Sequence, residues 1–371
     1  MRESQLCFVG DISLNGMYGE HCSINDSSYP FTLIKSQWKD CDLVVGNLES
    51  PLVPDRRIEP EFEYKTPLRA DIRHAAGLRQ AGFNLFCLSN NHILDYGELG
   101  ADSTQALLDE QGLLHFGYGG NLDAAKALKT LSVNSLTVGF AGYTDMVIDS
   151  PFWAGPTTRG IAKLDIDAAR DETAKQKASV DILVVSLHWG IEHFHLPSPE
   201  QLRNARTLVD SGADLVIGHH PHVLQGIERY KNGLIAYSLG NFVFSDILWK
   251  WQTPEGENRL CLFPVSGRKR YGAILKVKIG STGISSHEVI GTFINKRGQI
   301  QVNSYAAGQI HALSSNLARS DYQRYFRIEL GRFNRSEKLK DMLKRLPRFY
   351  KIRPKHLREL SILIRGDKEP P

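Results

Sequence analysis

The sequence has no apolar run that approaches the roughly 18 residues of a membrane-spanning helix. Its first residues, Met-Arg-Glu-Ser-Gln, lead directly into an apolar segment, so we expect no signal peptide. The five cysteines are odd in number and form no Cys-x-x-Cys pair, which argues against a disulfide framework and indicates a cytoplasmic protein. A Gly-x-Ser-x-Gly elbow is missing, and the glycine cluster at 117–120 lacks phosphate-loop spacing. Serine-hydrolase and P-loop chemistry are therefore not expected.

The composition is that of a soluble globular protein, with 42% hydrophobic and 23% charged residues among 371. The net charge of +4 conceals an asymmetry, because residues 320–371 contain 15 Lys and Arg against 7 Asp and Glu. Such a basic segment is either a solvated extension or a peripheral contact surface for an anionic polymer or a membrane. It lacks the interleaved aromatic residues of nucleic-acid platforms, so no specific nucleic-acid partner is expected.

Short apolar runs alternate with amphipathic stretches along most of the chain. The runs suit strands that are buried on both faces, and they lie at 6–9, 43–45, 85–88, 137–141, 182–187, 215–217 and 235–237. The stretches with helical periodicity lie at 68–81, 101–111, 165–178 and 199–210. Ser198 followed by Pro199 is typical of a helix start, and Gly82 and Gly212 follow two helices as C-caps. This alternation predicts an α/β fold with a largely parallel core.

The organisation changes after residue 244. Residues 246–270 mix Trp, Pro and Gly, and we expect them to form an insert, either a loop or a lid. Residues 271–279 alternate apolar and polar side chains, which predicts a half-exposed strand that closes the sheet, with 287–295 as its partner. We therefore expect one domain at 1–295 and a basic, mainly helical C-terminal extension at 296–371.

Six short polar signatures follow apolar runs. They are Gly10-Asp11, Asn47-Leu48-Glu49, Asn90-Asn91-His92, His188-Trp189-Gly190, Gly218-His219-His220-Pro221-His222 and Gly240-Asn241. The carboxyl ends of parallel strands meet at one edge of a sheet, where ligands bind, so these side chains should gather there. Carboxylates, carboxamides and imidazoles together form a ligand set for one or two divalent metal ions. The imidazoles favour Mn, Zn or Fe over Mg or Ca.

Individual residue types indicate individual ligand roles. Asp11 and Glu49 each offer a carboxylate that can bridge two ions, and Asn91 offers a neutral amide oxygen. His188 adds an imidazole at the end of another strand. The structural alternative is that Asp11 caps a loop and that Asn47 and Asn91 satisfy turn backbones.

The histidine-rich signature is harder to explain by packing alone. His220 and His222 flank Pro221, so in extended geometry their rings share one face and ligate the same ion. His219 then points the other way and is the weaker ligand candidate. Next to Asn91, His92 is placed to protonate a leaving group, and Asp95 can hold its ring in one tautomer.

Taken in order, these signatures resemble the CapA family, which is named for poly-γ-glutamate capsule biosynthesis and belongs to the calcineurin-like metallophosphoesterase superfamily. The resemblance covers about residues 5–245. It implies a four-layer α-β-β-α sandwich with two facing β-sheets, and it places His92 in the acid position. The metal ligands it implies are Asp11, Glu49 or Asn47, Asn91, His188, His220 and His222. Framework or substrate contacts are expected at Lys65, Glu192, His219 and Asn241.

The sequence departs from the superfamily pattern at two points. Asp11 is followed by Ile12-Ser13, where the superfamily usually has Asp-x-His. The second motif is Gly46-Asn47, where Gly-Asp is usual. One ion can then be bound tightly and a second weakly, or a different ion can be chosen.

Three functions remain open. The first is a metal-dependent hydrolase or transferase that acts on a phospho- or γ-glutamyl/peptide-type substrate in polymer biosynthesis. The second is a metal-assisted peptide epimerase, in which His92 and a facing group such as His193 exchange a Cα proton. The third is a non-catalytic accessory protein that binds an anionic polymer or a synthase partner.

Overall fold

The computed structural model describes residues 3–19, 26–54, 57–61, 66–145, 152–252 and 258–345. The chain divides into two compact units, Met1–Leu317 and Ala318–Pro371. This division differs from the expected boundary at residue 295, because β18 (Ile300–Val302) and α7 (Ser304–Leu317) pack on the strands of the first unit. The described part of the second unit contains α8 (Tyr322–Arg345), as the predicted helical extension requires. Within the described residues, no helix is both long enough and apolar enough to cross a membrane.

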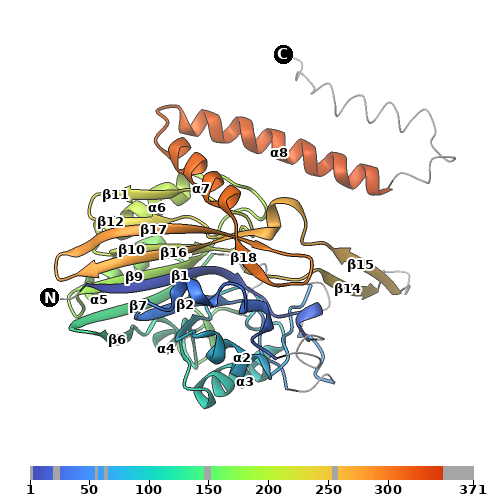
Figure 1. Ribbon diagram of the computed structural model, residues 1–371, viewed down its shortest axis with the longest axis horizontal. Helices are drawn as coiled ribbons and strands as arrows, with labels where there is room; N and C mark the ends of the chain where they lie inside the picture. The colour runs from blue at the N-terminus through green and yellow to red at the C-terminus, as the bar shows by residue number, and fades with distance from the viewer. Residues whose placement is uncertain are drawn as a thin grey trace. The chain divides into compact units, whose positions relative to one another are not determined.

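The first unit contains two large sheets, of which the first is mixed. Its order is β18-β17-β16-β1-β2-β3-β4, with β13 also paired to β1. The bounds are β1 Ser4–Ile12, β2 Leu43–Leu48, β3 Leu85–Cys87, β4 Leu114–Phe116, β13 Asn241–Val243, β16 Tyr271–Gly280 and β17 Gly283–Ile294. Strands β1 to β4 and β13 run parallel. Strand β16 is antiparallel to β1, and the two lie side by side in Figure 1. The predicted strand at 271–279 is confirmed as β16, although β17 and β18 extend the sheet beyond it.

The second large sheet has the order β11-β12-β10-β9-β7-β6. Its bounds are β6 Lys129–Val133, β7 Leu136–Thr144, β9 Ile182–His188, β10 Leu215–His219, β11 Ile227–Tyr230 and β12 Gly233–Ala236. The neighbours β7, β9, β10 and β12 are parallel, which agrees with the predicted parallel core. A separate two-stranded ladder joins β5 (Tyr118–Gly119) to β8 (Gly160–Ile161).

Helices cover the outer faces of both sheets. The α-helices that lie wholly within the described part of the first unit are α2 His74–Ala81, α3 Gly97–Glu110, α4 Leu122–Lys126, α5 Ile166–Lys177, α6 Pro199–Asp210 and α7. The short 3-10 helices are Tyr29–Phe31, Lys35–Trp38 and Gly267–Arg270. Helix α6 begins as predicted, because Ser198 and Gln201 form a capping box. The helix expected from residue 68 begins only at His74, because Ala70 forms an isolated bridge with Leu52 and its amide donates to the carbonyl of Pro51 at 2.9 Å.

The two sheets face one another and complete a four-layer sandwich. Side chains of both sheets line the narrow space between them, including Phe8 and Phe116 of the first and Phe140 and Ile217 of the second. On the outer side of the first sheet, α2 and α3 contribute to one apolar cluster with β1 and β3. On the second sheet, α5 contacts β9 and α6 contacts β10. The predicted four-layer α-β-β-α architecture is therefore confirmed.

The segment expected to be a loop or lid contains regular structure. Strands β14 (Ile247–Gln252) and β15 (Asn258–Phe263) form an antiparallel ladder in which Ile247 pairs with Phe263 and Gln252 with Asn258. The loop interpretation of 246–270 is therefore wrong for these strands. The mixed composition of this segment gives no clear sign that its two halves pair as strands.

Candidate metal centre

Asp11 lies in β1 and is held by groups from both sheets. Its carboxylate is fully buried. Oδ1 accepts a hydrogen bond from Asn47 Nδ2 at 2.9 Å and lies 3.1 Å from His219 Nδ1. Oδ2 accepts from the backbone amide of His220 at 3.2 Å and lies 3.4 Å from His222 Nδ1. Asp11 therefore has a fixed orientation toward the centre of the site.

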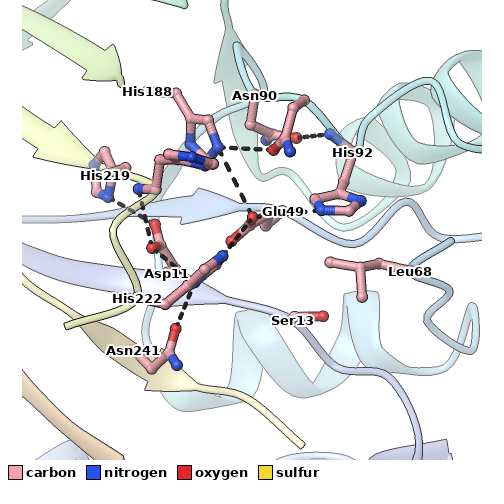
Figure 2. Close-up of polar contacts among 12 residues, drawn as sticks. Asp11, Ser13, Glu49, Leu68, Asn90, His92, His188, His219, His222 and Asn241 are labelled. Carbon is pink, nitrogen blue, oxygen red and sulfur yellow. Dashed lines mark hydrogen bonds and ion pairs between the residues drawn. The ribbon is translucent and has the colours of Figure 1, made fainter. Parts of the chain in front are cut away.

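Glu49 follows β2 and stands in the middle of the imidazoles. Its Oε1 lies 3.5 Å from His222 Nε2, 3.8 Å from His188 Nε2 and 3.9 Å from His92 Nε2. Figure 2 shows these three rings pointing toward the buried carboxylate. Asp11, Glu49 and His222 each offer one ligand atom, and the three atoms lie within 4.8 Å of one another. This triad could hold a divalent cation.

The loop after β10 carries the histidine-rich signature in an unusual backbone conformation. His220 has φ of 95° and His222 has φ of 55°. The extended geometry expected for this segment is therefore wrong. The two rings nevertheless enter the same cluster, with centroids 5.8 Å apart. His222 Nδ1 lies 2.9 Å from Asn241 Oδ1, which fixes the ring and leaves Nε2 toward Glu49.

His188 ends β9 and meets the loop that follows β3. Its Nε2 lies 2.8 Å from Asn91 Oδ1. The preceding residue, Asn90, was not among the predicted site residues, yet it supports the whole turn. Its Oδ1 accepts from the amides of His92 and Ile93 at 3.0 Å, and its Nδ2 donates to the Leu48 carbonyl at 2.9 Å. The sequence contained a signal for this role, since an Asn in the loop after a strand commonly satisfies turn backbones.

His92 and Asp95 form a close pair beside this centre. His92 Nδ1 lies 2.7 Å from Asp95 Oδ2, and the same oxygen accepts from the amide of Leu68. The opposite ring nitrogen, Nε2, faces Glu49. This arrangement places the proton on Nδ1 and directs Nε2 into the site.

The residues expected to contact substrate differ in position. Lys65 lies outside the described residues. Glu192 is exposed, and its carboxylate lies near the rings of His220 and His222. His219 is 4% exposed and Asn241 is 1% exposed. Both of these buried side chains contact a candidate ligand, a position that suits holding that ligand better than contacting substrate.

His193 adjoins the site through its backbone and ring. It has φ of 62°, and its amide donates to the carbonyl of Pro221 at 2.7 Å. Its ring centroid lies 6.2 Å from that of His222. The loop after β9 is thereby tied to the loop after β10.

Burial dominates the electrostatics of the imidazoles. It lowers the pKa of His188 far below its ordinary value and that of His220 to about 3. Burial opposes ionisation of Asp11, but the hydrogen bond and charge of His219 outweigh it and lower the pKa of this carboxyl. Neutral imidazoles beside an ionised carboxylate are the protonation states that binding of a divalent cation requires.

The protein is thus a layered α/β sandwich of two facing sheets, with a buried cluster of carboxylates and imidazoles at the ends of its strands. The chain belongs to the family described as bacterial capsule synthesis protein PGA_cap, whose model matches residues 5–246. The resemblance to CapA is thereby confirmed.

Two curated relatives are named CapA. Capsule biosynthesis protein CapA of Bacillus anthracis is 34% identical over 244 residues, which cover 64% of this chain and 59% of that protein. PGA biosynthesis protein CapA of Bacillus subtilis (strain 168) is 33% identical over 238 residues, covering 64% and 62%. The chain thus spans about three fifths of the length of these relatives.

Solved structures give a looser likeness. A putative 5′-nucleotidase from Staphylococcus aureus aligns with a TM-score of 0.41 at 13% identity, over 84% of this chain and 58% of that one. A likeness at this level carries no functional argument.

Proposed function

We propose that Asp11, Glu49 and His222 bind a divalent metal ion in the active site of a CapA-type hydrolase or transferase. The observation that carries this proposal is Glu49 Oε1, which lies within 3.9 Å of three imidazole nitrogens. Asn91 and His188 complete the proposed ligand set on the other side of Glu49. Their imidazole content favours Mn, Zn or Fe over Mg or Ca. When bound, the ion supplies Lewis-acid polarisation of a phosphoryl or carbonyl oxygen and activates water.

Asn47 has a supporting role in this proposal. Its amide nitrogen donates to Asp11, and its amide oxygen lies 3.3 Å from Asn90 Nδ2. Both ends of the carboxamide are therefore used within the protein. Of the two residues, Glu49 is therefore the better candidate ligand.

His92 is the proposed proton donor. Asp95 fixes the ring through Nδ1–H, and in the doubly protonated imidazolium Nε2–H is directed into the site and can deliver a proton to a leaving oxygen or nitrogen. Because Asp95 is itself held by the amide of Leu68, the ring keeps its orientation when it changes protonation state. His92 is therefore assigned to acid–base chemistry and the carboxylates to cation binding.

The proposed substrate is a phospho- or γ-glutamyl/peptide-type compound used in capsule polymer biosynthesis. The names of the two CapA relatives support this context. The basic residues of 320–371 suit an anionic polymer or membrane surface, with the catalytic unit formed by the preceding residues. A cytoplasmic location and association with a polymer synthase are parts of the same proposal.

Two variants test the division of roles. The purified protein, loaded with Mn²⁺, should hydrolyse bis-p-nitrophenyl phosphate or γ-glutamyl-p-nitroanilide. His92→Ala should lower kcat by about a hundredfold or more and leave the metal content unchanged, because it removes only the proton donor. Glu49→Gln should lose metal and activity together. Metal content by mass spectrometry and release of the chromophore check both expectations.

The control is His311→Ala, at an exposed position on α7. It should change neither quantity. Loss of metal in His92→Ala would assign His92 as a ligand instead. A protein that binds no ion and is insensitive to chelation would contradict the enzymatic proposal and favour the accessory function. A Mycobacterium tuberculosis relative, 29% identical over 214 residues, is named a probable polyglutamine synthesis accessory protein.

The epimerase alternative gains no support from the described residues. It requires His193 to face His92 across a substrate. The ring contact recorded for His193 is with His222.

A further inference from the structure

Helix α8 arranges part of the basic C-terminal charge on one of its faces. Arg324, Arg327, Gly331, Arg335 and Lys338 follow one another at intervals of three or four residues, so they lie on the same side of the helix. The four cations of this set are all exposed, and we refer to them as the basic stripe. At 1.5 Å per residue, the stripe extends over about 21 Å of the helix.

The members of the basic stripe are not neutralised by neighbouring carboxylates. Two ion pairs are formed by described arginines of the second unit, Arg319 with Asp321 and Arg332 with Glu329. Neither pair includes a member of the stripe. Within the described residues, its donors are therefore available to an anionic partner, and guanidinium groups bind carboxylates through two parallel hydrogen bonds.

Gly331 lies in the middle of the stripe. A glycine inside a helix costs about 1 kcal/mol relative to alanine. A Cβ built on Gly331 would lie 3.7 Å from Nη1 of Arg335, so the side chain of Arg335 extends back over the glycine, along the stripe. The glycine leaves space in which an extended chain can approach the helix backbone closely.

The opposite face of α8 is apolar and buried. Tyr322 and Phe326 lie two residues to either side of Arg324, which places them about half a turn away, and they are 6% and 7% exposed. Among the described side chains of α8, Ile328 is the large apolar residue that is exposed, at 44%. A helix that enters a membrane surface needs a whole apolar face for the lipid.

The exposed face of α8 therefore offers a partner charge, and little apolar surface. The basic stripe also contains no aromatic side chain on which a nucleic-acid base could stack. A row of separate cations along about 21 Å of helix fits a flexible linear polyanion, whose charges repeat along an extended chain.

We propose that the basic stripe of α8 binds a linear polycarboxylate along the helix axis. The inference rests on the proposed function for the identity of this polymer, and it goes further by assigning the binding to one helix face. Each stripe residue pairs with one carboxylate of the polymer. The attraction acts between exposed charges, so binding should weaken as the salt concentration rises.

A binding assay on the full-length protein tests this proposal. Metal is removed by chelation, and the fluorescence anisotropy of fluorescein-labelled poly-γ-glutamate is measured at about 50 and 300 mM sodium chloride. Wild-type protein should bind at the lower concentration and lose about tenfold or more of its affinity at the higher one. The triple variant Arg324→Gln, Arg327→Gln, Arg335→Gln should raise the Kd at low salt by about tenfold.

The matched control removes the same amount of charge from the first unit. Lys35→Gln, Lys39→Gln and Lys175→Gln are combined at exposed positions and should change the Kd by less than about twofold. Equal weakening by the two triple variants would overturn the stripe and leave only an effect of net charge. Circular dichroism of both variants checks that the helices are retained.

Glu49→Gln separates this inference from the proposed function. It removes a proposed metal ligand and should bind the polymer as wild type does. Active wild-type protein whose polymer binding is unchanged by the stripe variant overturns the stripe alone. Stripe-dependent polymer binding by a protein that holds no metal and hydrolyses no substrate supports the stripe and overturns the enzymatic proposal.

Two other probes identify the kind of anion. Polyphosphate of equal charge should bind less tightly than poly-γ-glutamate, and tighter binding of polyphosphate would overturn the assignment to a polycarboxylate. Vesicles of phosphatidylserine and phosphatidylcholine should not retain the protein through the stripe. Stripe-dependent binding to vesicles without binding to the polymer would overturn the proposal in favour of a membrane surface.

Discussion

At the residue scale, the site contains side chains whose backbone is held in sparsely populated conformations. His220 and His222 both have positive φ, a region that branched and bulky L-residues rarely adopt. Such conformations cost on the order of 1–3 kcal/mol each and persist only where the surrounding structure imposes them. Here the imposed conformation turns two rings into one polar cluster. The positions of these two rings are therefore obtained at a cost in local stability.

A pair of substitutions at His220 isolates this backbone cost. In metal-free protein, His220→Gly should be more stable than His220→Ala by about 1 kcal/mol, because only glycine adopts positive φ without steric cost. Both variants remove the same ring, so the cavity is nearly equal. Urea unfolding of the two proteins measures the difference.

The adjacent His219 supplies the control. It ends β10 and is not among the residues with positive φ. At this position the order should reverse, with His219→Ala more stable than His219→Gly by about 0.5–1 kcal/mol. The same order at both positions would contradict the role of strain.

The places of the candidate metal ligands in the fold could be predicted from the sequence more readily than the side chains that contact them. Asp11 and Asn47 lie near the ends of the neighbouring parallel strands β1 and β2, and the convergence of parallel strands is enough to bring them together. The contact between Asn241 and His222 could not be read in the same way, since it joins residues from different sheets. The metal roles themselves stay predictions.

At the element scale, glycine allows two strand pairs to approach more closely than a side chain permits. A Cβ on Gly10 would lie 2.0 Å from the carbonyl oxygen of Gly240, and one on Gly218 would lie 2.0 Å from that of Tyr237. Each glycine directly precedes a polar signature, at Asp11 and His219. The close approach of the strands thus sets where the following side chains project.

Gly218→Ala should disturb fold and site together. The added methyl group meets the backbone of Tyr237, which directly follows β12 and cannot move as the end of a side chain does, so the free energy of unfolding should fall by about 1–3 kcal/mol. Metal content should fall too, because the loop that begins at His219 is displaced. Thermal unfolding and metal analysis of one preparation check both.

Gly120→Ala is the matched control, since nothing lies within 4 Å of a Cβ built there. It should leave both quantities near wild type. If Gly218→Ala did the same, close strand approach would not explain this glycine.

Elements governed by local signals were easier to predict than those governed by distant partners. Helix α6 has the predicted bounds because its cap, Ser198 with Gln201, lies within a few residues of its start. The predicted start of α2 at Leu68 is six residues too early, because Ala70 pairs with the distant residue Leu52 in an isolated bridge. The β14–β15 ladder was missed because Pro and Gly in that segment favoured a loop interpretation.

At the scale of the whole molecule, His74 links stability to pH. It begins α2 and is 1% exposed. Burial lowers its pKa to about 4, with the charge of Asp71 opposing the shift. The unfolded chain takes up this proton near pH 6.5, so protonation between these two values favours unfolding. The contribution of His74 is fully present above about pH 6.5 and is lost as the pH falls toward 4.

His74→Gln should flatten this dependence. Between pH 7 and pH 4 the free energy of unfolding of wild type should fall by about 3 kcal/mol more than that of the variant. Urea unfolding at several pH values gives both curves. His311→Gln, at an exposed position of α7, should follow wild type. Parallel curves for wild type and His74→Gln would contradict this assignment.

The polar cluster also joins the two halves of the sandwich. Asp11 and Glu49 come from the first sheet, and the loop after β10 comes from the second. A cation bound by residues of both sheets would cross-link the two halves of the sandwich. The ion would then dissociate when the two sheets separate locally, so the lifetime of the bound ion would measure how often this edge of the protein opens.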